Sequence, residues 1–263
     1  MNPSSSVLDR FNLAGKIILL TGGSGLYGRG LAADLAGAGA TLIIASRDLA
    51  KLEAVAAEEN ALGHKVFAEC FDQSSEESIR QLLKRILDRH GPIDGLVNNA
   101  VARPMGAGTP FLESWEHSMR INATGLVLMH RHFGEAMAAQ GEGSIVNIGS
   151  IYGMVGPHLG FYEGTDMGTP SPDYFFHKGG MINLSRYYAG VLGPRGIRVN
   201  CLSPGGFFNH QPEAFVKHYN EQTYLNRMGD EADLGGAVIF LLSKAAKYIT
   251  GVNLPVDGGF TAM

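Results

Sequence analysis

The chain has 263 residues, of which 45% are hydrophobic and 17% are charged. This composition supports a sizeable core and excludes disordered and fibrous proteins. Its 21 basic and 25 acidic side chains give a net charge of −4, and no basic face or arginine-rich arm occurs. A nucleic acid partner is therefore not expected. The 36 glycines follow no repeat and gather at a few turns, which makes those turns the first places to search for a binding site.

The two cysteines and the N-terminal segment indicate the cellular compartment in which the protein is expected. Cys70 and Cys201 each stand alone in an apolar run, so neither a disulfide framework nor a paired metal or redox motif is indicated. Residues 1–16 lack the basic and apolar regions of a signal peptide, and no apolar run is long enough to span a membrane. We expect a cytoplasmic protein with no membrane partner.

Short β-branched runs alternate with amphipathic stretches along the whole chain. This alternation is typical of parallel strands joined by crossover helices. The predicted strands are 16–21, 41–45, 65–69, 95–98, 144–149, 197–202 and 252–256. The predicted helices are 28–39, 49–62, 76–90, 115–139, 174–192 and 232–242. We expect an α/β fold of the Rossmann type, with a doubly wound, mainly parallel seven-stranded sheet and helices on both faces.

No change of composition divides the chain, so residues 1–263 are expected to form one dinucleotide-binding catalytic domain. Two segments, near 151–173 and 205–225, interrupt the alternation of strands and helices. Each follows the carboxyl end of a predicted strand, which is where doubly wound sheets bind ligands. Both are expected to line a substrate pocket.

The first predicted strand ends in a glycine-rich turn, TGGSGLYG, with a G-x-G-x-x-G pattern at Gly23, Gly25 and Gly28. Glycines let the backbone approach a pyrophosphate, and the N-terminus of the following helix offers free N–H groups and a positive dipole end. A tight strand-to-helix turn is the alternative. The strand before the motif and the helix after it favour dinucleotide binding.

The second predicted strand ends at Ser46 and Arg47, where an NAD-binding protein would carry a carboxylate for the adenosine ribose. An arginine there can pair with the 2′-phosphate of NADP. The alternative is a solvated arginine partly neutralised by Asp48. The sequence favours NADP(H), and NAD(H) stays open.

Tyr174 and Lys178 are four residues apart on a predicted helix and therefore share a face. A nearby ammonium favours the phenolate and lowers the pKa of a tyrosine, which makes the phenol a usable acid or base. The same spacing also occurs on solvated helix faces. Its position downstream of the dinucleotide loop, after a strand that ends at Gly149 and Ser150, favours a catalytic pair.

Taken together, these motifs resemble the short-chain dehydrogenase/reductase superfamily in its compact single-domain branch, from Leu13 to Gly259. The resemblance implies that Tyr174 is the general acid/base and that Lys178 lowers its pKa and holds the nicotinamide ribose. It further implies that Ser150 binds the substrate oxygen and that Asn122 supports a water-mediated proton relay. The implied cofactor residues, besides Tyr174 and Lys178, are Gly22, Gly23, Ser24, Gly25, Leu26, Tyr27, Gly28, Ser46, Arg47, Asp72, Asn98, Asn99, Ala100, Pro204, Gly205 and Asn209.

The chain departs from the family pattern in three places. Leu26 replaces the middle glycine of the loop, so Gly25 is expected to take over its role, and Val101 replaces the glycine that ends the Asn-Asn-Ala segment. Ser150 and Tyr174 are 24 residues apart (174 − 150), further than the family usually shows. The extra stretch carries carboxylates and hydroxyls, which suit a hydroxylated ligand or belong to a plain surface loop.

A weaker resemblance, in Tyr162 to Thr165 and Gly205 to Pro212, is to a bacterial branch associated with surface sugars such as nonulosonic acids. Arg103 is interpreted either as a ligand for a substrate phosphate or carboxylate or as half of a structural salt bridge. The histidines form no metal pattern, and His177 is expected to face outward.

The sequence therefore predicts hydride transfer between a nicotinamide cofactor and a small carbonyl or secondary alcohol compound. The alternatives are a non-catalytic nicotinamide sensor of the same fold and, less favoured, a lyase or epimerase. The family resemblance also implies a homodimer or homotetramer, with helices 115–139 and 174–192 at the interface.

Overall fold

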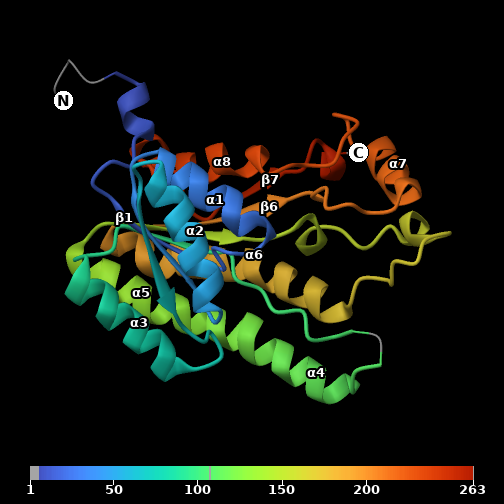
Figure 1. Cartoon of the computed structure of the whole chain (residues 1–263), viewed down its shortest axis with the longest axis horizontal. Coiled ribbons are helices and arrows are strands. Elements are labelled where there is room, and N and C mark those ends of the chain that lie inside the picture. The colour runs from blue at the N-terminus through green and yellow to red at the C-terminus, as the bar shows by residue number, and fades with distance from the viewer. Residues whose placement is uncertain (1–5, 107, 263) are drawn as a thin grey trace.

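The computed structural model describes residues 6–106 and 108–262, and within them a seven-stranded sheet runs through the middle of the molecule (Figure 1). The strand order is β3-β2-β1-β4-β5-β6-β7, and every neighbouring pair is parallel. The sheet is thus parallel throughout rather than mainly parallel. The strands are β1 (Ile17–Thr21), β2 (Thr41–Ser46), β3 (Lys65–Cys70), β4 (Gly95–Asn98), β5 (Gly143–Ile148), β6 (Ile197–Pro204) and β7 (Asn253–Val256).

Helices cover both faces of the sheet. On one face lie α1 (Leu26–Gly37), α2 (Leu49–Ala61) and α8 (Ala232–Leu242), and on the other lie α3 (Glu76–Arg89), α5 (Leu126–Gln140) and α6 (Pro172–Leu192). Two shorter helices, α4 (Phe111–Ser118) and α7 (Glu213–Glu221), lie at one end of the molecule (Figure 1). The expected doubly wound α/β fold is confirmed.

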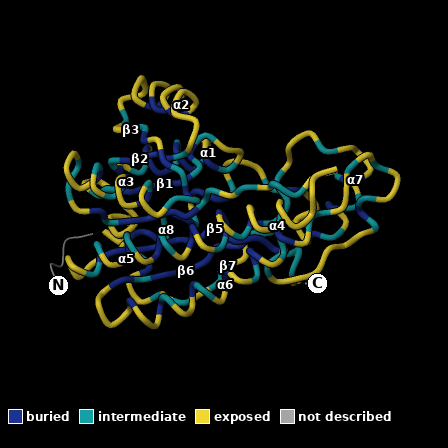
Figure 2. The backbone as a smooth tube through the Cα atoms, turned by 90° about the horizontal axis from the view of Figure 1, so that it is seen from below, coloured by how far each residue is buried: buried dark blue, intermediate teal, exposed yellow. Residues whose placement is uncertain are grey.

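Two apolar cores result from this layering, because successive side chains of a strand point to opposite faces. Leu20 and Ile44 pack on one face with Leu35 of α1, whereas Leu19 and Ile43 pack on the other with Phe133 of α5. Figure 2 shows the inner strands dark with burial, whereas the edge strands β3 and β7 and the outer sides of the helices are partly exposed. Each buried leucine or isoleucine contributes about 2 kcal/mol of hydrophobic stabilisation.

The helix predicted over 115–139 is divided. α4 ends at Ser118, a π-helical turn spans Met119–Gly125, and α5 then continues to Gln140. Gly125 packs on Gln73, so closely that a Cβ atom would lie 2.4 Å from the Gln73 carbonyl oxygen. A π-helical turn inside an α-helix frequently marks a functional site, and this one contains Asn122.

The sheet also fixes where a ligand can bind. From β1 the chain winds outward to β2 and β3, and then returns to β4 on the other side of β1 and winds the opposite way. Such a switch point leaves a crevice at the carboxyl ends of the two central strands. Within the described ranges, no helix has both the length and the apolar character needed to cross a membrane.

Candidate active site

A cleft of about 830 Å³ opens at the carboxyl ends of β1, β2, β4 and β5. Both irregular segments identified in the sequence line it, through residues between Ile151 and Ser171 and between Gly205 and Tyr219. Both segments therefore contribute to the wall of this cleft. The cleft has two ends, one beside Arg47 and the other beside Tyr174.

The glycine-rich turn forms the floor of the cleft. Gly22 has a φ of +70°, its N–H donates to the Ala45 carbonyl oxygen at 2.7 Å, and its carbonyl oxygen accepts from the Gly25 N–H at 3.0 Å. This tight turn leads into α1, whose first-turn N–H groups have no acceptor within the helix. A Cβ on Gly28 would lie only 2.0 Å from the Gly22 carbonyl oxygen, so Gly28 permits this approach.

The predicted loop residues therefore have different roles in the geometry. Gly22, Ser24, Gly25, Leu26 and Tyr27 line the cleft, whereas Gly23 and Gly28 do not. Gly23 instead packs on Ile44. The turn offers a close backbone approach and unpartnered N–H groups, which is the arrangement that a pyrophosphate requires.

At the end of β2, Ser46 and Arg47 both line the cleft. The buried Ser46 hydroxyl has no hydrogen-bond partner in the described part of the chain. Asp48 does not pair with Arg47 and instead caps α2, accepting from the Lys51 N–H at 3.2 Å and pairing with the Lys51 ammonium at 2.9 Å. An orphaned hydroxyl and an arginine with an uncommitted guanidinium fit the phosphorylated ribose of a dinucleotide.

Asp72 lines the cleft near Arg47 and accepts hydrogen bonds from the Ser74 N–H at 2.9 Å and the Ser74 hydroxyl at 2.8 Å. Its pKa is lowered: burial opposes this shift, and the two Ser74 hydrogen bonds and the Arg47 and Arg120 charges outweigh it. The carboxylate is therefore ionised and held in place at the wall of the cleft.

The wall between β1 and β4 contains Asn99 and Ala100, as expected. The Thr21 hydroxyl accepts from the Asn99 N–H at 3.1 Å and the Ala100 N–H at 3.0 Å, and the Asn99 amide donates to the Thr21 carbonyl oxygen at 3.1 Å. Asn98, which the family resemblance also placed along the cofactor, is buried away from the cleft. Its amide donates to the Asn147 side chain at 2.8 Å.

Tyr174, Ser150 and Lys178 come together at the other end of the cleft. Burial raises the pKa of the Tyr174 phenol, but the Lys178 and Arg103 charges and the hydrogen bonds from Ser150 and Arg103 outweigh burial and hold the pKa below its usual value. The buried Lys178 ammonium donates to the Ile148 carbonyl oxygen at 2.6 Å. Burial lowers the pKa of Lys178, and the Tyr174 phenolate opposes this shift.

The Ser150 hydroxyl is held by the backbone two residues further along the chain. Ser150 caps the short helix Ile151–Gly153, and its hydroxyl oxygen accepts from the Tyr152 N–H at 3.1 Å, which leaves the hydroxyl proton to be donated into the cleft. The three side chains thus place a polarised hydroxyl, a phenol with a lowered pKa and an ammonium around one point. Such a cluster can protonate or deprotonate a substrate oxygen.

Asn122 lies behind the cleft rather than in its lining. Its side-chain amide binds both backbone groups of Ala102. Oδ1 accepts from the Ala102 N–H at 2.9 Å, and Nδ2 donates to the Ala102 carbonyl oxygen at 2.8 Å. It also donates to the Ser118 hydroxyl at 3.0 Å. Its side chain is therefore committed to the wall that carries Ala102.

His177 is buried, so the expectation that it faces outward is wrong. The first turns of α6 pack against the π-helical turn, and His177 Nε2 lies 2.9 Å from the Ser118 hydroxyl. Ser118 donates to Asp173 Oδ2 at 2.5 Å, so it accepts from His177 and from Asn122. Neutral His177 therefore carries its proton on Nε2. This buried network ties the helix of Tyr174 to the turn of Asn122.

The substrate end of the cleft is lined by phenols and amides together with apolar side chains: Tyr152, Tyr162, Tyr219, Asn209 and Gln211, and Met167, Phe207, Phe215 and Met228. Of these side chains, Asn209 alone was predicted as a site residue. The Tyr152 and Tyr162 hydroxyls hydrogen-bond to each other at 3.0 Å, and the Tyr219 hydroxyl accepts from the Gly206 N–H. The inserted carboxylates, Glu163 and Asp166, are exposed and do not line the cleft. The polar groups that the insertion contributes to the cleft therefore include phenols and no carboxylate, because Glu163 and Asp166 turn to solvent and Asp173 is buried against Ser118.

Of three further predicted cofactor residues, one differs in position. Asn209 and Gly205 line the cleft, but Pro204 does not, because it ends β6 and pairs with Val256 in the sheet. The aromatic residues between 207 and 219 were the signal that could have identified the missed lining. Among the described residues, no group of three or more His, Cys, Asp or Glu side chains is arranged to hold a metal ion.

A parallel doubly wound sheet with a dinucleotide cradle at one end of its crevice and a serine, tyrosine and lysine cluster at the other defines a class, the nicotinamide-dependent oxidoreductases. Residues 25–261 match a family model described as enoyl-(acyl carrier protein) reductase. The chain belongs to the short-chain dehydrogenase/reductase superfamily, as the sequence resemblance indicated.

Relatives with different substrates share this fold. The chain is 34% identical over 253 residues to 3-oxoacyl-[acyl-carrier-protein] reductase FabG of Aquifex aeolicus (94% of this chain, 98% of the relative). It is 32% identical over 259 residues to galactitol 2-dehydrogenase of Cereibacter sphaeroides (95% and 97%). A gluconate 5-dehydrogenase from Burkholderia cenocepacia, solved with NADP and tartrate, superposes with a TM-score of 0.86 at 30% identity (98% and 100%).

These findings decide between the two function classes that the sequence left open. The relatives are named dehydrogenases and reductases, and the protein is an NAD(P)-dependent oxidoreductase that acts on a small carbonyl or alcohol compound. No observation favours the non-catalytic sensor. The relatives' names include both an acyl-carrier reductase and a sugar-alcohol dehydrogenase, so they do not define one substrate.

Proposed function

We propose that the protein reduces a ketone, or oxidises the corresponding secondary alcohol, on a small hydroxylated compound, with NADP(H) as the preferred cofactor. The observation that carries this proposal is the Tyr174 phenol, whose pKa is lowered in a cleft lined by other phenols and amides. The relatives named for galactitol and gluconate support a hydroxylated substrate. The fit of Ser46 and Arg47 to a 2′-phosphate supports NADP(H).

In this proposal Tyr174 transfers a proton to or from the substrate oxygen, and Ser150 donates a hydrogen bond to the same oxygen as charge develops on it. Lys178 keeps the phenol acidic and, through its remaining N–H groups, would hold the ribose of the nicotinamide nucleotide. When bound, that nucleotide supplies or accepts the hydride. Asn122 holds the Ala102 wall and acts as a positioning residue.

The test of the proposal is NADPH and NADH oxidation by the purified protein, side by side, on a panel of ketoses, keto acids and simple apolar ketones. We expect NADPH to be consumed with hydroxylated ketones at a higher kcat/KM than with apolar ones. A preference for long apolar ketones would contradict the substrate class, and turnover without net change in NADPH would indicate a lyase or epimerase.

Arg47→Leu is expected to raise the KM for NADPH by about 10–100-fold and to leave the KM for NADH nearly unchanged, because the lost guanidinium would pair with the 2′-phosphate alone. Steady-state kinetics with both cofactors measures this. Arg80→Leu, which removes an exposed arginine from α3, is the matched control. An equal loss with both cofactors would contradict the role of Arg47.

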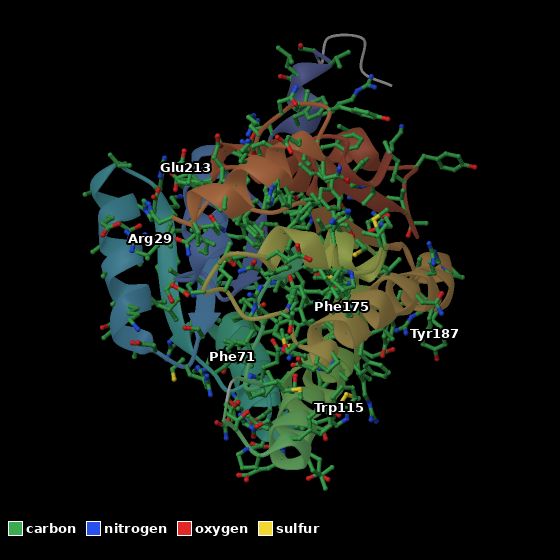
Figure 3. All side chains as sticks on the ribbon, turned by 90° about the vertical axis from the view of Figure 1, so that its right-hand side faces the viewer. Arg29, Phe71, Trp115, Phe175, Tyr187 and Glu213 are labelled. Carbon is green, nitrogen blue, oxygen red and sulfur yellow. The ribbon has the colours of Figure 1, made fainter. Side chains whose placement is uncertain are left out.

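We further propose that the chain acts as a single catalytic domain and assembles as a homodimer or homotetramer through the predicted interface helices, which the structure divides into α4, α5 and α6. Phe111, Phe176 and Tyr187 are 55–65% exposed on these helices, and Trp115 and Tyr187 are labelled in Figure 3. Large apolar patches of this kind often mark interfaces. Light scattering should give two or four times 28.1 kDa, and a monomer would contradict the proposal.

Two free cysteines, one of them exposed, support the proposal of a cytoplasmic location.

A further inference from the structure

Arg103 is the cation that the proposed chemistry leaves unexplained. It follows β4 on the loop that carries Asn99 and Ala100, and it lines the cleft at the substrate end. Its guanidinium carbon lies 4.6 Å from the centre of the Tyr174 ring, and the Lys178 ammonium lies 5.6 Å from the same centre. Two positive charges therefore flank the candidate acid/base.

The charge of Arg103 is not balanced by an acid. Within residues 6–106 and 108–262, no carboxylate oxygen lies within ion-pair distance of its guanidinium, although Arg195 and Arg227 each form an ion pair. Of the described acidic residues, Asp72 alone lines the cleft, and it lies near Arg47 at the opposite end. The salt bridge that the sequence reading left open is therefore not formed with any described residue.

The backbone around Arg103 is held firmly. Both the N–H and the carbonyl oxygen of the preceding residue, Ala102, are bound by the Asn122 amide, and Pro104 restricts Arg103 itself to an extended conformation. The Arg103 side chain lines the same cleft as Tyr162, and its guanidinium lies over the Tyr174 ring. A backbone held in this way keeps the Arg103 side chain in one place, as the positioning of a ligand requires.

We propose that Arg103 binds an anionic group of the substrate, a carboxylate or a phosphate, while the carbonyl carbon lies at Tyr174. This inference rests on the proposed function and narrows it to hydroxylated ketones that carry a negative charge. A guanidinium pairs with either anion through two parallel N–H donors, and an unbalanced positive charge in a cleft attracts anions over neutral analogues. The phenols and amides around it bind the hydroxyl groups.

Binding tests the inference without requiring turnover. The probes are D-gluconate and D-sorbitol, which share a six-carbon polyhydroxyl chain and differ in one terminal carboxylate. Each is titrated calorimetrically into the protein saturated with NADPH, because an alcohol and the reduced cofactor cannot react with each other. We expect gluconate to bind at least tenfold more tightly than sorbitol, Arg103→Gln to abolish the difference, and Arg103→Lys to retain part of it. Equal binding of acid and polyol by the unchanged protein overturns the proposal.

Turnover of three ketoses distinguishes a site for carboxylates from a site for phosphates. It also distinguishes substrate binding by Arg103 from the other roles that Arg103 could have. D-fructose, D-fructose 6-phosphate and 5-keto-D-gluconate are neutral, phosphorylated and carboxylated, and the anion with the higher kcat/KM identifies the class. We expect Arg103→Gln to raise KM for the preferred anion by tenfold or more, with the KM for D-fructose and the Kd of NADPH unchanged. Arg80→Gln is the control.

Two results overturn the inference and leave the proposed function intact. An equal loss on all three ketoses, with no additional rise in the KM for the anions, would show that Arg103 acts only through the pKa of Tyr174. A raised Kd for NADPH would show that it binds the cofactor. Failure to oxidise NADPH with any ketone would instead contradict the proposed function, while the gluconate and sorbitol titrations would still decide the role of Arg103.

Discussion

Tyr174→Phe is expected to lower kcat/KM by roughly 10²–10⁴-fold, the range that a positioned general acid or base contributes. The substitution removes one hydroxyl and keeps the ring, so the Arg103 guanidinium keeps its stacking partner. The Kd of NADPH should stay within about a factor of two, because the predicted cofactor contacts are distributed over the whole cleft. Steady-state kinetics and a fluorescence titration of NADPH measure the two quantities.

Tyr152→Phe is the matched control for this change. Tyr152 also lines the cleft, and its hydroxyl is bound to that of Tyr162. Burial raises the pKa of Tyr152 above its usual value, so its phenol is a poor proton donor or acceptor. We expect its loss to affect KM more than kcat. Turnover of Tyr174→Phe at the rate of the unchanged protein, or an equal fall of kcat in Tyr152→Phe, would contradict the assignment.

The framework of the site was predictable because it depends on local signals. The strand before Gly22 and the helix after Gly28 placed the dinucleotide cradle, and the four-residue spacing placed Tyr174 and Lys178 on one face. These features follow from helix and strand periodicity, which neighbouring residues alone determine. The alternation of strands and helices also predicted the doubly wound class of the sheet, whereas the strand order comes from the structure.

The wall of the substrate end was less predictable because it depends on tertiary contacts. His177 looked like a surface residue until the π-helical turn brought Ser118 beside it, 59 residues earlier in the chain. The insertion was polar by composition, yet Glu163 and Asp166 turn outward, whereas Tyr152 and Tyr162 line the cleft. Composition does not indicate which side of an irregular segment faces the cleft, since such a segment has no period.

Lys178→Met is expected to move the pH limb of alcohol oxidation to higher pH. In oxidation Tyr174 must be the phenolate, which forms above its pKa. Removing the ammonium removes the largest charge that lowers that pKa, so the pKa rises and the rate at neutral pH falls. We expect kcat/KM for oxidation to fall by about 10²–10³-fold at neutral pH, since both the phenolate and the ribose contact are lost.

In the reduction direction the same variant depends on the opposite protonation state of Tyr174. Reduction requires the protonated phenol, so the alkaline limb of reduction should also move to higher pH. In the oxidation direction, raising the pH should restore part of the lost rate. Lys178→Arg keeps the charge, so its limb should stay near that of the unchanged protein even if packing lowers the rate. Urea unfolding must accompany these profiles, because Lys178→Met leaves the Ile148 carbonyl oxygen without its 2.6 Å donor, at a cost of about 1–3 kcal/mol. A folded Lys178→Met protein with an unmoved limb would show that the charge of Lys178 does not set the acidity of Tyr174.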